Sequence, residues 1–117
     1  LNIFCKNNIS YAAIEASSHG LEQDRMTGLK FQVAIFTNLG RDHLDYHKDS
    51  EAYFKSKEKL FLNYLQDGGH AVINIDDYYG RKLIQNLKNR PINIKTFGEH
   101  ADADFRIQSI KPTNYGR

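Results

Sequence analysis

The densest group of side chains able to bind a metal lies in residues 37–47. Two carboxylates and two imidazoles fall within six positions of this segment, at Asp42, His43, Asp45 and His47. Transition metals favour imidazole with carboxylate, whereas Mg²⁺ takes oxygen ligands from carboxylates, water and phosphate. The spacing does not match a standard zinc pattern. Glu15 is a further candidate for Mg²⁺, although a carboxylate there could equally cap a helix that starts near Ser17.

Lys57 is the charged residue whose position on a predicted helix is unexpected. The helix covers residues 50–65, and at about 100° per residue its large apolar side chains fall within about 60° of one direction. Lys57 lies at the centre of the arc formed by Tyr53, Phe54, Leu60, Phe61 and Tyr64. Its charged neighbours are predicted to face solvent, namely Lys55, Glu58 and Lys59.

An ammonium on the core side of a helix is costly to bury, and burial lowers its pKa. Three outcomes are open for Lys57. Its chain reaches water, or the amine pairs with a buried carboxylate, or the neutral amine reacts with carbon dioxide. The third outcome gives a carbamate, which is an anionic oxygen ligand suited to Mg²⁺.

The elements that must position these residues alternate between strands and helices. Apolar runs predict strands at residues 10–17, 31–38, 70–75, 92–97 and 104–110. Two helices are predicted, at residues 50–65 and 76–88. This alternation is typical of βαβ units, so we expect an α/β fold with a mostly parallel sheet and flanking helices. Polar clusters follow three of the strands, where ligands of such sheets gather.

Composition excludes several classes of protein. The chain has 117 residues and a single cysteine, Cys5, so a disulfide framework is excluded and a reducing cytoplasm is expected. No run of about 18 apolar residues is present, which argues against a membrane partner. The net charge of +2 and the scattered basic residues argue against nucleic acid.

Four segments of the chain form a recognisable series in their order and spacing. They are Glu15-Ala-Ser-Ser-His-Gly-Leu21 with Gln23 and Arg25, Thr37-Asn-Leu-Gly-Arg-Asp-His-Leu-Asp-Tyr-His47, Ala52-Tyr53 through Phe61, and Asn74-Ile-Asp-Asp77. Together they resemble the Mur ligases, and among these the branch that adds the third residue of the peptidoglycan stem peptide, the UDP-N-acetylmuramoyl-tripeptide synthetases. The resemblance extends from about residue 9 to about residue 110.

The resemblance implies the family's three-layer, P-loop-type central domain and an ATP-dependent ligation through an acyl phosphate. The substrates would be UDP-N-acetylmuramoyl-dipeptide and an amino acid, either diaminopimelate or lysine. It implies that Glu15 binds one Mg²⁺ ion, and that His43 and a carbamylated Lys57, formed with carbon dioxide, serve another. It further implies that the UDP-linked substrate contacts Ser17, Gln23 and Arg25, and that the nucleotide lies near Asn74 and Asp77.

One departure from the family pattern limits what these residues can do alone. No Gly-Lys-Ser/Thr triplet occurs in the sequence, so the loop that cradles the nucleotide phosphates is missing. We therefore expect residues 1–117 to form part of a central ATP-binding domain, without the family's N- and C-terminal domains, and to be inactive in isolation. The alternatives are a relative of the folylpolyglutamate or cyanophycin synthetases and a catalytically silent α/β binding module.

Overall fold

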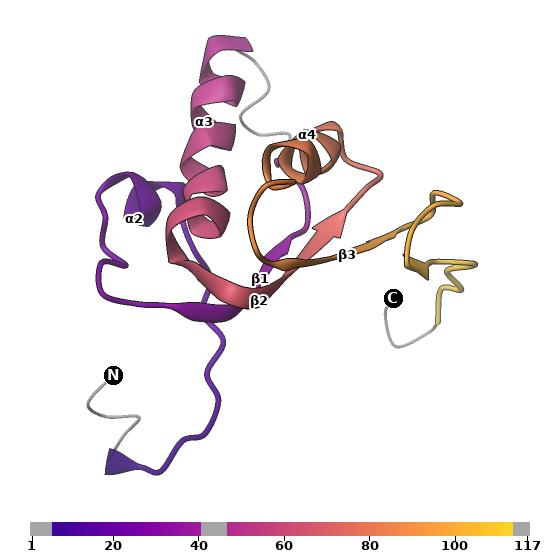
Figure 1. The fold of residues 1–117 in the computed structure, drawn as a ribbon. Coiled ribbons are helices and arrows are strands. Elements are labelled where there is room, and N and C mark those ends of the chain that lie inside the picture. Colours follow the sequence, from indigo (N-terminus) through magenta and orange to yellow (C-terminus); the bar gives the residue numbers. More distant parts are fainter. Residues whose placement is uncertain (1–5, 41–46, 114–117) are drawn as a thin grey trace.

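The computed structural model describes residues 6–40 and 47–113, which build a parallel sheet with helices packed on it (Figure 1). The four strands lie in the order β1-β2-β3-β4, and every neighbouring pair is parallel. Their bounds are Phe31–Phe36 for β1, Leu65–Asn74 for β2, Asn93–Gly98 for β3 and Phe105–Arg106 for β4. The predicted parallel α/β fold is confirmed.

Helices connect the strands in the predicted alternation. The connection from β1 to β2 contains α3 (His47–Lys59), which continues into η2 (Leu60–Tyr64), a π-helical turn. The helix α4 (Tyr78–Asn86) joins β2 to β3, and the short helix α2 (Ser18–Glu22) precedes β1. The helix predicted at residues 50–65 is therefore longer at its start and changes its hydrogen bonding in its last turn.

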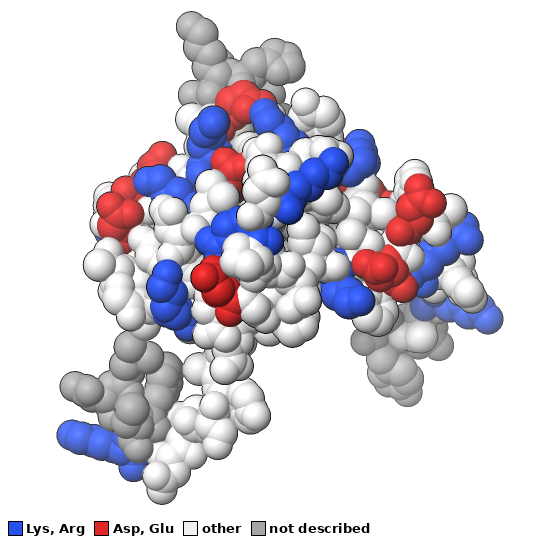
Figure 2. All heavy atoms as spheres, in the orientation of Figure 1, with Lys and Arg blue, Asp and Glu red and all other residues white. Residues whose placement is uncertain are grey.

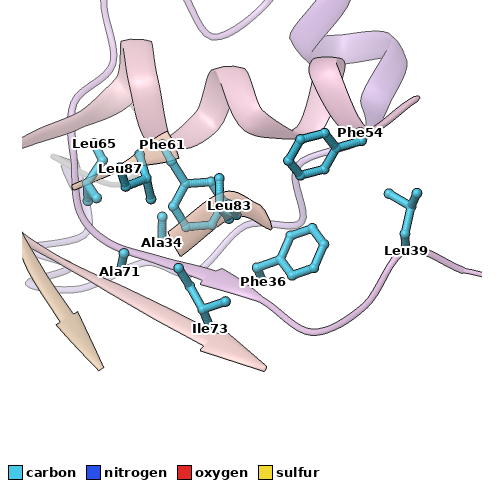
Figure 3. Close-up of a cluster of buried hydrophobic side chains, with 10 residues drawn as sticks. All are labelled: Ala34, Phe36, Leu39, Phe54, Phe61, Leu65, Ala71, Ile73, Leu83 and Leu87. Carbon is cyan, nitrogen blue, oxygen red and sulfur yellow. The ribbon is translucent and has the colours of Figure 1, made fainter. Parts of the chain in front are cut away.

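The core lies between one face of the sheet and the helices α3 and α4 (Figures 1 and 3). Alternate residues of β1 and β2 point into it and meet aromatic and aliphatic side chains from above. The ten buried members are Ala34, Phe36, Leu39, Phe54, Phe61, Leu65, Ala71, Ile73, Leu83 and Leu87. Val33 and Ile35 point to the opposite face and are 50% and 59% exposed. The described residues thus supply two of the three expected layers.

Two predicted strands differ from the structure. Residues 10–17 form no strand, since their backbone pairs with no described neighbour and most of their side chains are exposed. The strand predicted at 104–110 is reduced to Phe105–Arg106. Apolar composition favours an extended chain, but a strand also needs a partner within hydrogen-bonding distance.

The second strand is longer than its apolar run predicts. It begins at Leu65 rather than at residue 70. It passes through Gly68, whose φ of +76° is a backbone conformation that glycine adopts without steric cost. The register with β1 shifts there, because Phe31 pairs with Leu65 whereas Val33 pairs with His70. Such a bulge explains why the sequence predicts the strand only from residue 70, after the pair Gly68 and Gly69.

Charged side chains of both signs are intermixed on the face seen in Figure 2. Among the residues that the structure describes, no helix combines the length and apolarity needed to cross a bilayer.

Candidate functional site at the carboxyl edge of the sheet

Polar residues that follow β1 and β2 meet at the carboxyl edge of the sheet. The Asn74 side-chain amide donates a hydrogen bond to the carbonyl oxygen of Thr37 at 2.8 Å, which ties the ends of the two strands together. The same side chain accepts a hydrogen bond from the backbone N–H of Asp76 at 2.9 Å. In open α/β sheets this edge is where ligands bind. The structure therefore brings together at this edge one residue from each of two expected polar clusters, Thr37 and Asn74.

A groove of about 800 Å³ runs along β1, between that strand and residues 10–16. Its walls combine apolar and polar side chains, the polar ones including Glu15, Asn38 and Lys57. Because β1 is the edge strand among the described residues, its outer side is lined by residues 10–16 without strand pairing. The groove is thus a concave site that opens beside the ends of the strands.

The structure places Lys57 in this groove. Its Nζ donates a hydrogen bond to the carbonyl oxygen of Ala16 at 2.8 Å and lies 5.5 Å from the centroid of the Tyr53 ring. Burial lowers the pKa of Lys57, and the nearby charge of Glu15 partly opposes that shift. The amine is therefore turned toward the core side, and Glu15 and Lys57 are brought to the same groove.

The neighbours of Lys57 differ from the prediction that they all face solvent. Lys55 is exposed, but Glu58 is only 6% exposed and accepts a hydrogen bond from the side-chain amide of Asn86. The helix α3 packs against α2 as well as against the sheet, and Asn86 reaches it from α4. A single apolar arc in the sequence does not reveal that a helix is buried on more than one side.

The residues predicted to bind the UDP-linked substrate lie around α2. The hydroxyl of Ser17 accepts a hydrogen bond from the backbone N–H of Gly20 at 3.0 Å and so caps the helix, while Gln23 ends it. A Cβ atom at Gly20 would lie 3.1 Å from Ser17 Oγ and 4.0 Å from Arg25 Cδ. The side chains of Ser17 and Arg25 therefore both lie next to Gly20. Ser17 directly follows the groove residues Glu15 and Ala16 in the sequence.

The two residues predicted near the nucleotide also have structural partners. Asp77 caps α4, because its Oδ1 accepts hydrogen bonds from the backbone N–H groups of Tyr79 at 2.8 Å and Gly80 at 3.2 Å. Asn74 is held by Thr37, as described above. Both lie at the carboxyl end of β2, and the helix predicted from residue 76 accordingly begins at Tyr78.

Asp76 also lies at this edge, although the sequence analysis treats it only as the first residue of a predicted helix. Its two carboxylate oxygens accept hydrogen bonds from the backbone N–H groups of Glu99 at 2.7 Å and His100 at 3.0 Å. The bond from Glu99, ahead of the one from His100, lowers the pKa of Asp76. Asp76 thereby attaches the loop after β3 to the end of β2. Its partners are 23 and 24 residues away, so no local signal announces the contact.

His43 lies outside the described residues, as do Asp42 and Asp45, and the side chain of His47 is not described. Within the described ranges, no group of three or more His, Cys, Asp or Glu side chains is placed to hold a metal ion. Glu15 supplies one oxygen donor to the groove, whereas the ammonium of Lys57 has no lone pair to offer. These two residues fit Mg²⁺ only if the lysine is converted into an oxygen ligand.

A parallel α/β sheet with a polar carboxyl edge and an inward-facing lysine in a groove defines an α/β domain of the class that binds ligands at the carboxyl ends of its strands. All of residues 1–117 match the family model described as the Mur ligase middle domain. The chain belongs to the Mur ligase middle-domain family, which confirms the resemblance seen in the sequence.

Individual relatives agree with this assignment. The chain is 44% identical over 115 residues to the UDP-N-acetylmuramoyl-L-alanyl-D-glutamate–2,6-diaminopimelate ligase of Neisseria meningitidis, covering 97% of this chain and 23% of that protein. The ligase of the same name from Clostridium perfringens is 41% identical over 110 residues, covering 92% and 22%. A solved structure of a ligase with this name matches with a TM-score of 0.82 at 37% identity, covering 97% of this chain and 23% of that one. The chain thus spans less than a quarter of these relatives.

Proposed function

We propose that this chain contributes the groove and carboxyl edge of an ATP-dependent ligase that joins 2,6-diaminopimelate to UDP-N-acetylmuramoyl-L-alanyl-D-glutamate in the cytoplasm, as a step of peptidoglycan synthesis. The observation that carries the proposal is Lys57, whose amine is turned into the groove beside Glu15. The names of the relatives support diaminopimelate as the added amino acid, in preference to lysine.

Lys57 is proposed to act as a carbamate. Because burial lowers its pKa, more of the amine is neutral near physiological pH than for a solvated lysine. The neutral amine attacks carbon dioxide, an N–C bond forms, and one proton is released to solvent. The product carries a carboxylate at the position where the structure places the amine nitrogen of Lys57. This conversion removes the repulsion that an ammonium would exert on a divalent cation.

Glu15 is proposed to hold one Mg²⁺ ion, and His43 and the carbamate on Lys57 are proposed to serve another. When bound, the ions would neutralise negative charge on the phosphates of ATP as the substrate carboxylate becomes an acyl phosphate. The protein's own contribution is the placement of anionic oxygens in a groove whose walls combine apolar and polar side chains. Charged groups act more strongly in such a partly desolvated site than in bulk water.

The substrates are proposed to bind on the two sides of this group. Ser17, Gln23 and Arg25 contact the UDP-linked dipeptide, and Arg25 suits an anionic group because its guanidinium donates in pairs. Asn74 and Asp77, which lie at the end of β2, are proposed to be near the nucleotide. Since the 117 residues contain no Gly-Lys-Ser/Thr loop, we propose that they form part of the central ATP-binding domain and that the isolated chain does not turn over ATP.

The test measures phosphate release by the protein that contains this chain, supplied with ATP, Mg²⁺, bicarbonate, the UDP-linked dipeptide and diaminopimelate. We expect release that requires both the UDP-linked dipeptide and diaminopimelate. Lys57→Ala should abolish ligation, and added short carboxylates should restore part of it. The matched control is Lys55→Ala, which changes an exposed lysine of the same helix and should keep normal activity. Normal ligation by Lys57→Ala would refute the carbamate.

Two alternatives are separated by the same assay. A folylpolyglutamate synthetase relative would use folate and glutamate in place of the UDP-linked dipeptide and diaminopimelate. A silent binding module would turn over neither pair, and mass spectrometry would show Lys57 without the added carboxyl group in the presence of bicarbonate.

A further inference from the structure

The segment that carries Ser17, Gln23 and Arg25 has a small hydrophobic cluster of its own. Leu21, Met26 and Tyr64 are buried there, separate from the main core. Two of these residues come from α2 and the turn after it, and Tyr64 comes from η2 at the end of the long helix. The cluster therefore joins the proposed substrate-binding segment to the helix that carries Lys57.

The π-helical turn accounts for the direction of Tyr64. Phe61 and Tyr64 lie three residues apart in η2, yet Phe61 packs in the main core and Tyr64 in the second cluster. A π turn closes its hydrogen bonds over five residues rather than four, so it rotates these two side chains further apart than an α-helix does. The change in helix type thus allows one helix to contact both clusters.

A pair of hydrogen bonds fixes the segment in addition to the apolar contacts. The Tyr64 hydroxyl donates to Oδ1 of Asp24 at 3.2 Å. The hydroxyl of Ser56, which lies in α3, donates to Oε1 of Glu22 at 2.9 Å. Both acceptors lie beside Gln23, and Asp24 directly precedes Arg25.

Asp24 is also the point at which the chain reverses. Its φ is +51°, in the left-handed region that only a few residue types tolerate. The reversal lets the backbone N–H of Arg25 donate to the carbonyl oxygen of Gly20 at 2.9 Å, and it brings the Arg25 side chain back over Gly20 toward Ser17. Holding the carboxylate of Asp24 therefore holds the starting point of the Arg25 side chain.

We propose that Tyr64 is a positioning residue for the UDP-linked substrate. Through Asp24 it sets Arg25 and Ser17 at a fixed place relative to Lys57, which belongs to the same continuous helix. This inference rests on the proposed function, because it assumes that the segment contacts that substrate. Without the hydroxyl contact, the turn samples other positions, and part of the binding energy of the substrate is used to order it.

The test is Tyr64→Phe in the protein that contains this chain. The ring stays in its cluster, so the melting temperature should change little. We expect the KM for the UDP-linked dipeptide to rise about three- to tenfold, with kcat and the KM for ATP unchanged, because one hydrogen bond to a charged group is lost. Tyr79→Phe removes a hydroxyl from a tyrosine packed against the main core and should leave every parameter unchanged.

Substitutions of Asp24 separate the hydrogen bond from the backbone conformation. Asp24→Gly keeps the left-handed turn but removes the acceptor, and should raise the same KM as Tyr64→Phe does. Asp24→Asn keeps both an oxygen acceptor and a residue that tolerates this conformation, and should restore the KM to within about twofold. The double variant Tyr64→Phe with Asp24→Gly should be no worse than either single variant, since both remove one contact.

Two results would overturn the inference, and they are distinguishable. If Tyr64→Phe ligates with an unchanged KM for the UDP-linked dipeptide, or lowers kcat alone, the positioning role is refuted while the proposed function stands. If the unaltered protein does not use the UDP-linked dipeptide at all, the proposed function fails and the inference fails with it.

Discussion

Removing the cap of α4 tests how strongly the carboxyl edge depends on a single side chain. Asp77 accepts hydrogen bonds from two backbone N–H groups that have no partner within the helix. Asp77→Ala should lower the free energy of unfolding by about 1 kcal/mol, within a range of about 0.5–2 kcal/mol for such caps. For a chain of this length that corresponds to a fall in the melting temperature of about 4 °C.

The position of α4 gives this substitution a local consequence. A Cβ atom at Gly80 would collide with the carbonyl oxygen of Asn74, so the first turn of the helix lies directly against the end of β2. The helix also contributes Leu83 to the core. Fraying of the first turn should therefore disturb Asn74 as well as the helix, and amide hydrogen exchange should speed up at residues 79 and 80 before it does so in β2.

The assay is thermal or urea unfolding of Asp77→Ala beside Asp77→Asn. The asparagine keeps an oxygen acceptor and is as good a cap, so it should lose only the charge interaction with the helix dipole, about 0.3 kcal/mol, and should unfold at a higher temperature than Asp77→Ala. If the two variants unfold at the same temperature, the hydrogen bonds of Asp77 do not stabilise α4. A rise in the KM for ATP that is shared by both variants would instead report its proposed place near the nucleotide.

Three further predictions concern Asp76, Gly98 and Lys57. The N–H groups of residues 99 and 100 lower the pKa of Asp76 in the folded chain. The Asp76 carboxylate therefore stabilises the fold above its unfolded pKa, and this stabilisation is lost as the pH falls through its folded pKa. The melting temperature should fall over that acidic range, and it should fall less steeply in Asp76→Asn. Gly98→Ala should destabilise the chain by about 1–3 kcal/mol in urea unfolding, because φ is +149° and the new Cβ would lie 2.6 Å from the Asp76 carboxylate, whereas Gly40→Ala meets nothing within 4 Å and should be neutral. Activation of ligation by bicarbonate should strengthen as the pH rises from about 7 to about 9, since only the neutral amine of Lys57 forms a carbamate; activation that weakens over this range contradicts the proposal.

The main elements of the fold were predictable because their signals are local. The β-branched run of β1, the amphipathic pattern of α3 and the acidic start of α4 each reflect neighbours within one or two turns of chain. The inward direction of Lys57 is of the same kind, since it follows from the angle between successive helical residues. The grouping of polar residues at one edge follows from parallel strands having their carboxyl ends on the same side.

The contacts that complete the site join residues far apart in sequence. Tyr64 reaches Asp24 across 40 positions, Lys57 reaches Ala16 across 41, and Asp76 reaches residues 99 and 100. Residues 10–17 have a strand-like composition but no described strand beside them, and Glu58 is buried although its neighbours in sequence are charged.

The sequence by itself therefore determined the central strands β1 to β3 and the helices α3 and α4 to within a few residues, which family the chain resembles, and which side of α3 Lys57 occupies. Only the tertiary structure decided that α3 is buried on more than one side, that its last turn is π-helical, and that Asp24 is held by Tyr64. The physical reason is that backbone propensity and periodicity act over a few residues, whereas hydrogen bonds and burial depend on which distant segments the packing of the core brings into contact.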